Sequence, residues 1–138
     1  MGEAELPRIR VVAAVIGRDG KYLITQRRPN AVLPLLWEFP GGKVEPDESD
    51  EAALTREIRH RLDVEIAIGE CIGFESHAYE HYIVDLYTYD CTIRSGTPAP
   101  RAVHTFEWVR SDEFDGYEFT PPDEASVAKL LGLGLRRE

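Results

Sequence analysis

The residues that could do chemistry concentrate in a single glycine-led segment of the chain. Gly41 and Gly42 form a pair that lets the backbone approach a ligand closely. A helix is expected to start shortly after them, and within it Glu57, His60 and Arg61 are spaced i, i+3 and i+4, so they share one face. A glycine loop and a charged helix face that converge on one spot are suited to handling phosphate groups or the cations that accompany them.

The helix that carries these side chains is predicted over residues 49–62. Ser49 is a suitable N-cap because its hydroxyl can accept a hydrogen bond from an amide of the first turn. Leu54, Ile58 and Leu62 recur every four residues and form one apolar stripe. We therefore expect this stripe to anchor the helix in a core, with the charged face to one side of it.

The remaining pattern predicts a single domain over residues 1–138, with flexible ends at about 1–8 and 132–138. The fold class is α/β (α+β), a mixed β-sheet sandwiched between helices, because strand patterns and helix patterns alternate loosely and include hairpins. The glycine pair is interpreted as a turn. Strands are expected at 10–16, 22–26, 37–39, 65–74, 82–93 and 105–109, and a second helix at 123–131.

The composition limits the class of partner. The formal net charge of −9 argues against a protein that binds duplex nucleic acid, which needs a basic face. The polar start has no signal-peptide core and no stretch is apolar enough to span a membrane, so we expect a cytoplasmic protein without a membrane partner. A small anionic ligand remains compatible with an acidic chain, because a local arginine cluster can bind it. The oligomeric state stays open.

Six positions in the glycine-led segment fall at a fixed spacing: Gly42, Glu48, Arg56, Glu57, Ile58 and Val64. This pattern resembles the Nudix box, and the lead-in WEFPGGKVEPDES is similar to that of MutT-like members. The resemblance implies a Nudix fold. It also implies a nucleoside triphosphate pyrophosphohydrolase of the 8-oxo-dGTP/CTP type that binds a small nucleotide and uses Mg²⁺ or Mn²⁺.

The resemblance assigns roles to matched residues. Glu57 corresponds to the catalytic base or a carboxylate that supports it, and it is the one remaining metal ligand of the helix. Glu48 and Arg56 hold the geometry of the loop and helix. Arg27 falls near the nucleotide; the alternative is an ordinary surface arginine. Asp123 also falls near the nucleotide; the alternative is a helix N-cap. The nucleotide-binding set is Arg27, Gly41, Gly42, Arg61 and Asp123.

Three departures from the family pattern concern the metal. The adjacent glutamate pair of the family is His60-Arg61 here, and a further glutamate of a late loop falls at about Ala102. Hard cations such as Mg²⁺ prefer oxygen ligands, so these changes remove both ligands and negative charge. We expect this chain to bind Mg²⁺ or Mn²⁺ poorly.

The altered helix face allows three interpretations. Arg61 could pair with Glu57 at i, i+4 while His60 is solvated, which is a common and weak surface arrangement. Arg61 could instead hold phosphate oxygens directly. Glu57 and His60 could also belong to a site for a softer metal, since imidazole suits zinc or iron.

The favoured function is a MutT-like protein that binds a nucleoside di- or triphosphate, with the metal-dependent hydrolysis lost or much weakened. One alternative is an active pyrophosphohydrolase with an atypical metal site built from Glu45, Glu48 and Glu57. A second alternative is an interaction module without catalysis.

An aromatic segment at 77–82 could stack on a base or pack on the sheet as part of a hairpin.

Overall fold

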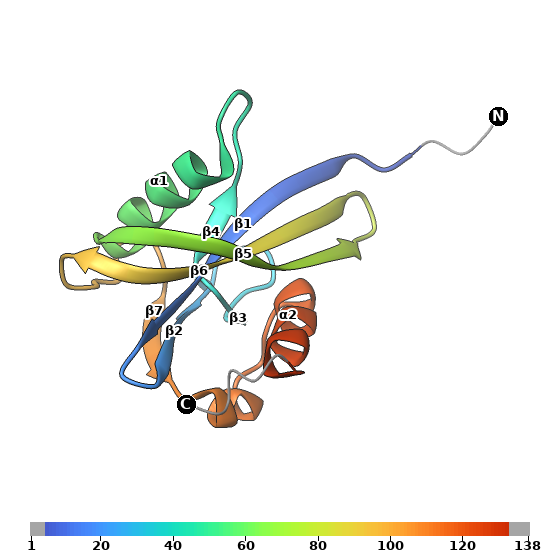
Figure 1. The fold of residues 1–138 in the computed structure, drawn as a ribbon. Coiled ribbons are helices and arrows are strands. Elements are labelled where there is room, and N and C mark those ends of the chain that lie inside the picture. The colour runs from blue at the N-terminus through green and yellow to red at the C-terminus, as the bar shows by residue number, and fades with distance from the viewer. Residues whose placement is uncertain (1–4, 133–138) are drawn as a thin grey trace.

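The computed structural model describes residues 5–132, which form a seven-stranded mixed sheet with helices on both sides (Figure 1). The first part of the chain forms β1 (Arg8–Arg18), β2 (Lys21–Gln26), β3 (Trp37–Glu38), β4 (Gly41–Lys43) and α1 (Asp50–Leu62). The second part forms β5 (Glu65–Ala78), β6 (Ile83–Ser95), β7 (Thr105–Val109), the 3₁₀ helix η1 (Ser111–Gly116) and α2 (Pro121–Gly132).

Strand β1 is the centre of the sheet, and its partners change along its length. On one edge it pairs in parallel with β6 from Arg8 to Ile16. On the other edge it pairs antiparallel with β4 over 11–13 and with β2 at 17–18. Strands β2 and β4 therefore pair with different parts of the same edge of β1. The other pairs are antiparallel, so the predicted mixed sheet is confirmed.

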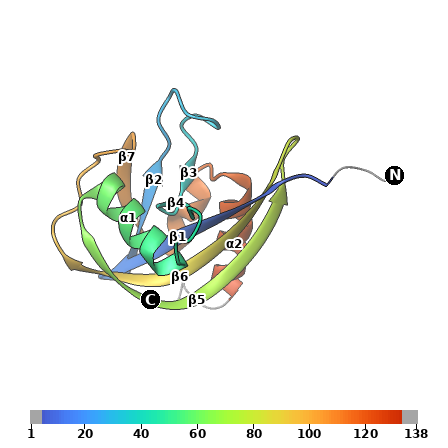
Figure 2. The same cartoon turned by 90° about the horizontal axis from the view of Figure 1, so that it is seen from above.

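Alternate residues of β1 face two separate cores. Val12, Ala14 and Ile16 are buried in a cluster with the apolar stripe of α1. Ala13 and Val15 are buried on the opposite face, in a cluster that includes Val127 of α2 and Phe114 of η1. The two helices consequently lie on opposite sides of the sheet (Figures 1 and 2), which confirms the expected sandwich.

Helix α1 follows its sequence signals closely. The Ser49 hydroxyl accepts a hydrogen bond from the Ala52 amide at 3.1 Å, and the apolar stripe of the helix is fully buried. The helix ends where Asp63 adopts a left-handed conformation with φ of 61°. Its first turn is also tied to the sheet, because Asp50 accepts hydrogen bonds from Arg10 and from the Tyr89 hydroxyl.

The glycine pair corrects a prediction. Gly41 and Gly42 do not form a turn but start β4, and neither has a positive φ. They are required for close approach: a Cβ at Gly41 would lie 1.9 Å from the Val12 carbonyl oxygen, and one at Gly42 would lie 2.3 Å from the carboxyl carbon of Glu57. The pair therefore lets β4 fit between β1 and α1.

Other element boundaries differ modestly from expectation. Helix α2 begins at Pro121 because proline fits the first turn of a helix, where its missing N–H costs nothing. Strand β5 extends to Ala78, and η1 was not predicted. Of the ends expected to be flexible, 1–4 and 133–138 lie outside the described residues. The Pro7 carbonyl accepts a hydrogen bond from Ile83. No helix within 5–132 is long and apolar enough to cross a membrane.

Candidate functional site

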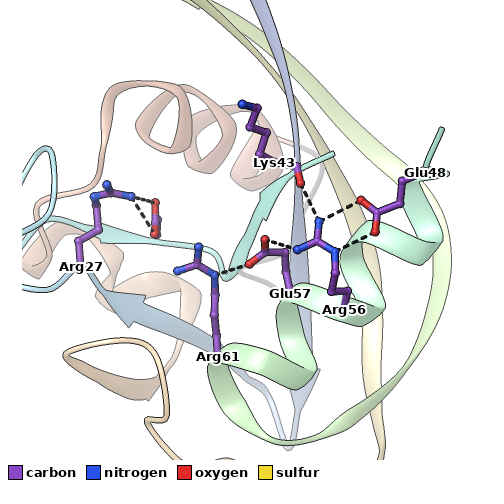
Figure 3. A network of polar contacts seen from close by, with 7 residues as sticks. Arg27, Lys43, Glu48, Arg56, Glu57 and Arg61 are labelled. Carbon is purple, nitrogen blue, oxygen red and sulfur yellow. Dashed lines mark hydrogen bonds and ion pairs between the residues drawn. The ribbon is translucent and has the colours of Figure 1, made fainter. Parts of the chain in front are cut away.

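Glu57 is the hub of the charged face of α1. One of its carboxylate oxygens accepts a hydrogen bond from Nη1 of Arg56 and the other from Nε of Arg61, both at 2.8 Å (Figure 3). The Glu57 side chain is only 11% exposed. The i, i+4 ion pair between Glu57 and Arg61, which was one interpretation of the sequence, is therefore present. His60, which precedes Arg61 on the helix, is exposed to solvent.

Arg56 joins the loop before α1 to the helix. Its guanidinium donates to both carboxylate oxygens of Glu48, at 2.8 and 2.9 Å, and to the Lys43 carbonyl at 2.9 Å. The hydrogen bonds that Glu48 accepts from Arg56, followed by the one from the Glu45 amide, lower the pKa of Glu48 to about 2. Arg56 thus connects β4, the loop and the Glu57 carboxylate.

A second ion pair, between Arg27 and Glu38, lines the same cavity as Arg61 of this network. Nη1 of Arg27 lies 3.3 Å from a carboxylate oxygen of Glu38, and its Nε donates to the Val32 carbonyl at 2.6 Å. Burial raises the pKa of Glu38, while the nearby positive charges of Arg27 and Arg61 oppose that rise. Sequence reasoning missed Glu38. A charged residue between Trp37 and Phe39 in a short apolar strand was the available signal.

The two networks border an open cleft that consists of connected cavities. A narrow part of about 220 Å³ lies over Gly41 and Gly42, and it is lined by Arg27, Arg61 and Asp123 among others. A wider part of about 370 Å³ shares Arg27 and Asp123 with it and is more apolar. The cleft thus brings together the sequence-predicted nucleotide-binding residues, which are separated by up to most of the chain length.

The wider part of the cleft has an aromatic wall from the tip of the β5–β6 hairpin. Tyr79 and Tyr82 line it, with ring centroids 5.2 Å apart, and His77 contacts Tyr79 at 4.6 Å. Val32 and Leu33 of the loop after β2 line the cleft as well. The aromatic segment therefore borders the cleft, and its rings offer flat faces to a planar ligand.

Asp123 lies at the junction of the narrow and wide parts. It is not the N-cap of α2, because the helix already begins at Pro121. Its carboxylate accepts hydrogen bonds from the Phe39 amide at 3.2 Å and from the Thr120 hydroxyl at 2.7 Å. Burial, followed by the neighbouring negative charge of Glu38, raises the pKa of Asp123 to about 7. The group therefore titrates within the physiological range.

This shift makes stability depend on pH. A carboxyl whose pKa is raised in the folded state favours folding while protonated, so stability is lost as pH rises from about 4, the unfolded value, through about 7. Asparagine does not titrate, so Asp123→Asn lacks this loss. Between pH 5 and pH 8, we expect the free energy of unfolding of the unmodified protein to fall by about 1 kcal/mol or more relative to that of Asp123→Asn. Urea titrations at both pH values measure this. An equal pH dependence in the two proteins would contradict the assignment.

The described residues do not fit a hard divalent cation at this site. Both Glu57 oxygens already accept hydrogen bonds from arginines, and Glu48 is held by Arg56. Within 5–132 no group of three or more His, Cys, Asp and Glu side chains is placed to hold a metal ion. A guanidinium occupies the position where the family pattern has a metal-binding carboxylate.

The late loop around Ala102 lies against the C-terminal end of α1. The amides of Arg101 and Ala102 donate to the Arg61 carbonyl at 3.0 and 3.2 Å, so the loop closes the C-terminal end of α1. Ala102 and Arg61 line the same small cavity. The methyl group of Ala102 adds no ligand to it.

Comparison with known proteins identifies the family. The sequence profile of the NUDIX domain matches residues 11–129. The chain belongs to the Nudix family. The match spans β1 through α2, so it includes the loop–helix segment, the cleft and both cores.

This Nudix protein is similar to named proteins and to solved structures. It is 38% identical to the CTP pyrophosphohydrolase of Escherichia coli (strain K12), over 94% of this chain and 96% of the relative. It is 38% identical to a MutT structure from methicillin-resistant Staphylococcus aureus 252, with a TM-score of 0.76 and coverage of 94% and 100%. A MutT structure from Methanosarcina mazei Go1, 23% identical, shares the fold with a TM-score of 0.83, covering 95% and 97%.

Proposed function

We propose that this Nudix protein binds a nucleoside di- or triphosphate in the cleft, with metal-dependent pyrophosphohydrolase activity lost or much weakened. The observation that carries the proposal is the position of Glu57 between Arg56 and Arg61, with a hydrogen bond at 2.8 Å to each. A carboxylate neutralised on both sides is a poor ligand for Mg²⁺ or Mn²⁺. The arginines that neutralise it are suited to phosphate oxygens.

The shape of the cleft orients the nucleotide. The wider apolar part suits the base, because Tyr79 and Tyr82 offer ring faces and Asp123 offers hydrogen bonds. Ionised, Asp123 only accepts hydrogen bonds; protonated, it also donates one. The narrow part suits the phosphates, because Arg27 and Arg61 line it together with the backbone of the glycine pair.

A second candidate is an active nucleoside triphosphate pyrophosphohydrolase. The name of the Escherichia coli relative favours it, and Glu57, Glu48 and Arg56 are all present. Such an enzyme would have to release Glu57 from Arg61 to admit a cation, at the cost of a buried hydrogen-bonded ion pair. A turnover assay over a nucleotide panel with Mg²⁺ and with Mn²⁺ separates the two functions.

The binding proposal predicts a selective stabilisation. A nucleoside triphosphate present at about 100 times its Kd should raise the free energy of unfolding by about 2.7 kcal/mol. The increase should persist in EDTA, since arginines replace the cation, and millimolar Mg²⁺ alone should give no shift. Thermal denaturation of the protein with each nucleotide, each metal and both measures this.

Two outcomes would contradict the proposal. Absence of a response to every nucleotide, with and without metal, would favour an interaction module. Stabilisation by Mg²⁺ alone, with stoichiometric binding in calorimetry, would show that a metal site exists in spite of the arginines.

A further inference from the structure

A third cavity, of about 190 Å³, opens from the narrow part of the cleft next to the C-terminal end of α1. Arg27, Glu38 and Arg61 line both cavities, so the two are continuous. Arg28, which no sequence argument selected, and Ala102 of the late loop line only the third one among the described cavities. Its wall therefore carries three guanidinium groups against a single carboxylate.

Each of these arginines is anchored through only some of its guanidinium nitrogens. Arg28 donates through one terminal nitrogen to the Arg101 carbonyl at 2.9 Å. Arg27 is held by Val32 and Glu38, and Arg61 is held through Nε by Glu57. Anchored guanidinium groups lose less conformational entropy when they bind an anion than free surface arginines do.

The remaining nitrogens of the guanidinium groups carry spare donors. Within residues 5–132, no acceptor bonds to either terminal nitrogen of Arg61, to Nε and Nη1 of Arg28, or to Nη2 of Arg27. Asn30 adds an amide to the lining. A cavity with several unused charged donors matches a ligand that has only acceptor oxygens and more than one negative charge.

We propose that this cavity binds the terminal phosphate groups of a polyphosphate directly, without a divalent cation, and that Arg28 is a determinant of phosphate number. This inference rests on the proposed function and extends it to the phosphate tail. When the base lies near Asp123 and the first phosphates lie over Gly41 and Gly42, the end of the phosphate tail reaches Arg61 and Arg28. A monophosphate does not extend that far, so Arg28 distinguishes triphosphates from monophosphates.

The test is calorimetry in EDTA with the full chain. The ligands are the mono-, di- and triphosphate of one nucleoside that stabilises the protein, together with inorganic tripolyphosphate. The variants are Arg28→Gln, Arg28→Lys and the control Arg101→Gln. Arg101→Gln is a matched control because it removes the same charge from the adjoining loop. The Arg101 side chain donates a hydrogen bond to Asp63 and does not line the cavity.

We expect Arg28→Gln to weaken triphosphate binding about tenfold or more, as for a charged hydrogen bond, and to leave monophosphate binding within about twofold. Arg28→Lys should recover only part of the loss, because lysine lacks the planar fork. Arg101→Gln should change neither. Tripolyphosphate that binds with the same dependence on Arg28 would show that the cavity recognises the polyphosphate alone.

Other outcomes separate the two proposals. If no nucleotide binds the unmodified protein, the proposed function fails and this inference fails with it. If nucleotides bind but mono- and triphosphates have equal affinity, or Arg28→Gln behaves like Arg101→Gln, only this inference is overturned. Triphosphate binding that requires Mg²⁺ would also overturn it.

Discussion

The triple variant His60→Glu, Arg61→Glu and Ala102→Glu is expected to raise Mg²⁺-dependent pyrophosphohydrolase activity by several orders of magnitude. Metal-assisted attack on a phosphoanhydride needs a cation that neutralises developing charge and lowers the pKa of the attacking water. The variant frees one oxygen of Glu57 from Arg61 and adds oxygen ligands around the position that the guanidinium now holds. The late loop already lies beside Arg61, because the Ala102 amide donates to the Arg61 carbonyl and both residues line one small cavity.

The scaffold that would position the new ligands is intact. Arg56 still links the loop to the helix through Glu48, and the glycine pair still admits Glu57 beside β4. Each single change should do much less than the three together, because a cation needs several ligands at once and contacting residues are not additive. Turnover of a nucleoside triphosphate, measured with and without Mg²⁺, gives the comparison.

A fourth change supplies the control. Addition of Glu57→Gln to the triple variant should remove most of the gain, since the amide is a poorer ligand and no base. Similar turnover in the unmodified protein and the triple variant, with both folded, would show that another set of residues already performs the reaction. Gained activity that survives the loss of Glu57 would show that the new site lies elsewhere.

Gly41→Ala is expected to destabilise the protein by about 3–5 kcal/mol, in the upper range for a single substitution. The added Cβ would lie 1.9 Å from the Val12 carbonyl oxygen and 2.7 Å from the Ala13 Cα, both backbone atoms that no side-chain rotation can move. Strand β4 would have to move away from β1, which breaks their pairing and the hydrogen bond from the Ala14 amide to the Pro40 carbonyl.

Gly116→Ala is the matched control for this substitution. No atom lies within 4 Å of the Cβ that it would add, so its effect should stay within about 0.5 kcal/mol. For a chain of this size, the loss at Gly41 corresponds to a decrease in Tm of roughly 10–17 °C, measurable by thermal denaturation followed by circular dichroism. Equal melting of Gly41→Ala and the unmodified protein would show that β4 has freedom that the structure does not suggest.

The sequence predicted those features whose causes are local. The N-cap of Ser49 and the buried stripe of Leu54, Ile58 and Leu62 were predicted, and the pairing of Glu57 with Arg61 was one of three interpretations left open. All three features depend on residues within a few turns of one helix. Such contacts are fixed by the helix period, so spacing along the chain is enough to predict them. The β-branched run in β1 likewise predicted a buried strand.

The sequence did not predict features that need two distant segments. The glycine pair looked like a turn because glycine favours turns, whereas its cause is the approach of β1 on one side and Glu57 on the other. Asp123 looked equally suited to a helix cap, yet its carboxylate bonds to the amide of Phe39, which is 84 positions earlier. A single residue type fits several local roles, and only its distant neighbours decide among them.

The sequence by itself determined the family, and it showed no carboxylate at positions 60, 61 and about 102, because both features depend on residue identity at fixed spacing. Only the tertiary structure decided what the residues at these positions contact. It brings Arg27, Arg28 and Arg61 from separate elements around one cavity and leaves donors of each unused. Charge acts through space, so the sign and strength of a site depend on distances that a linear sequence does not contain.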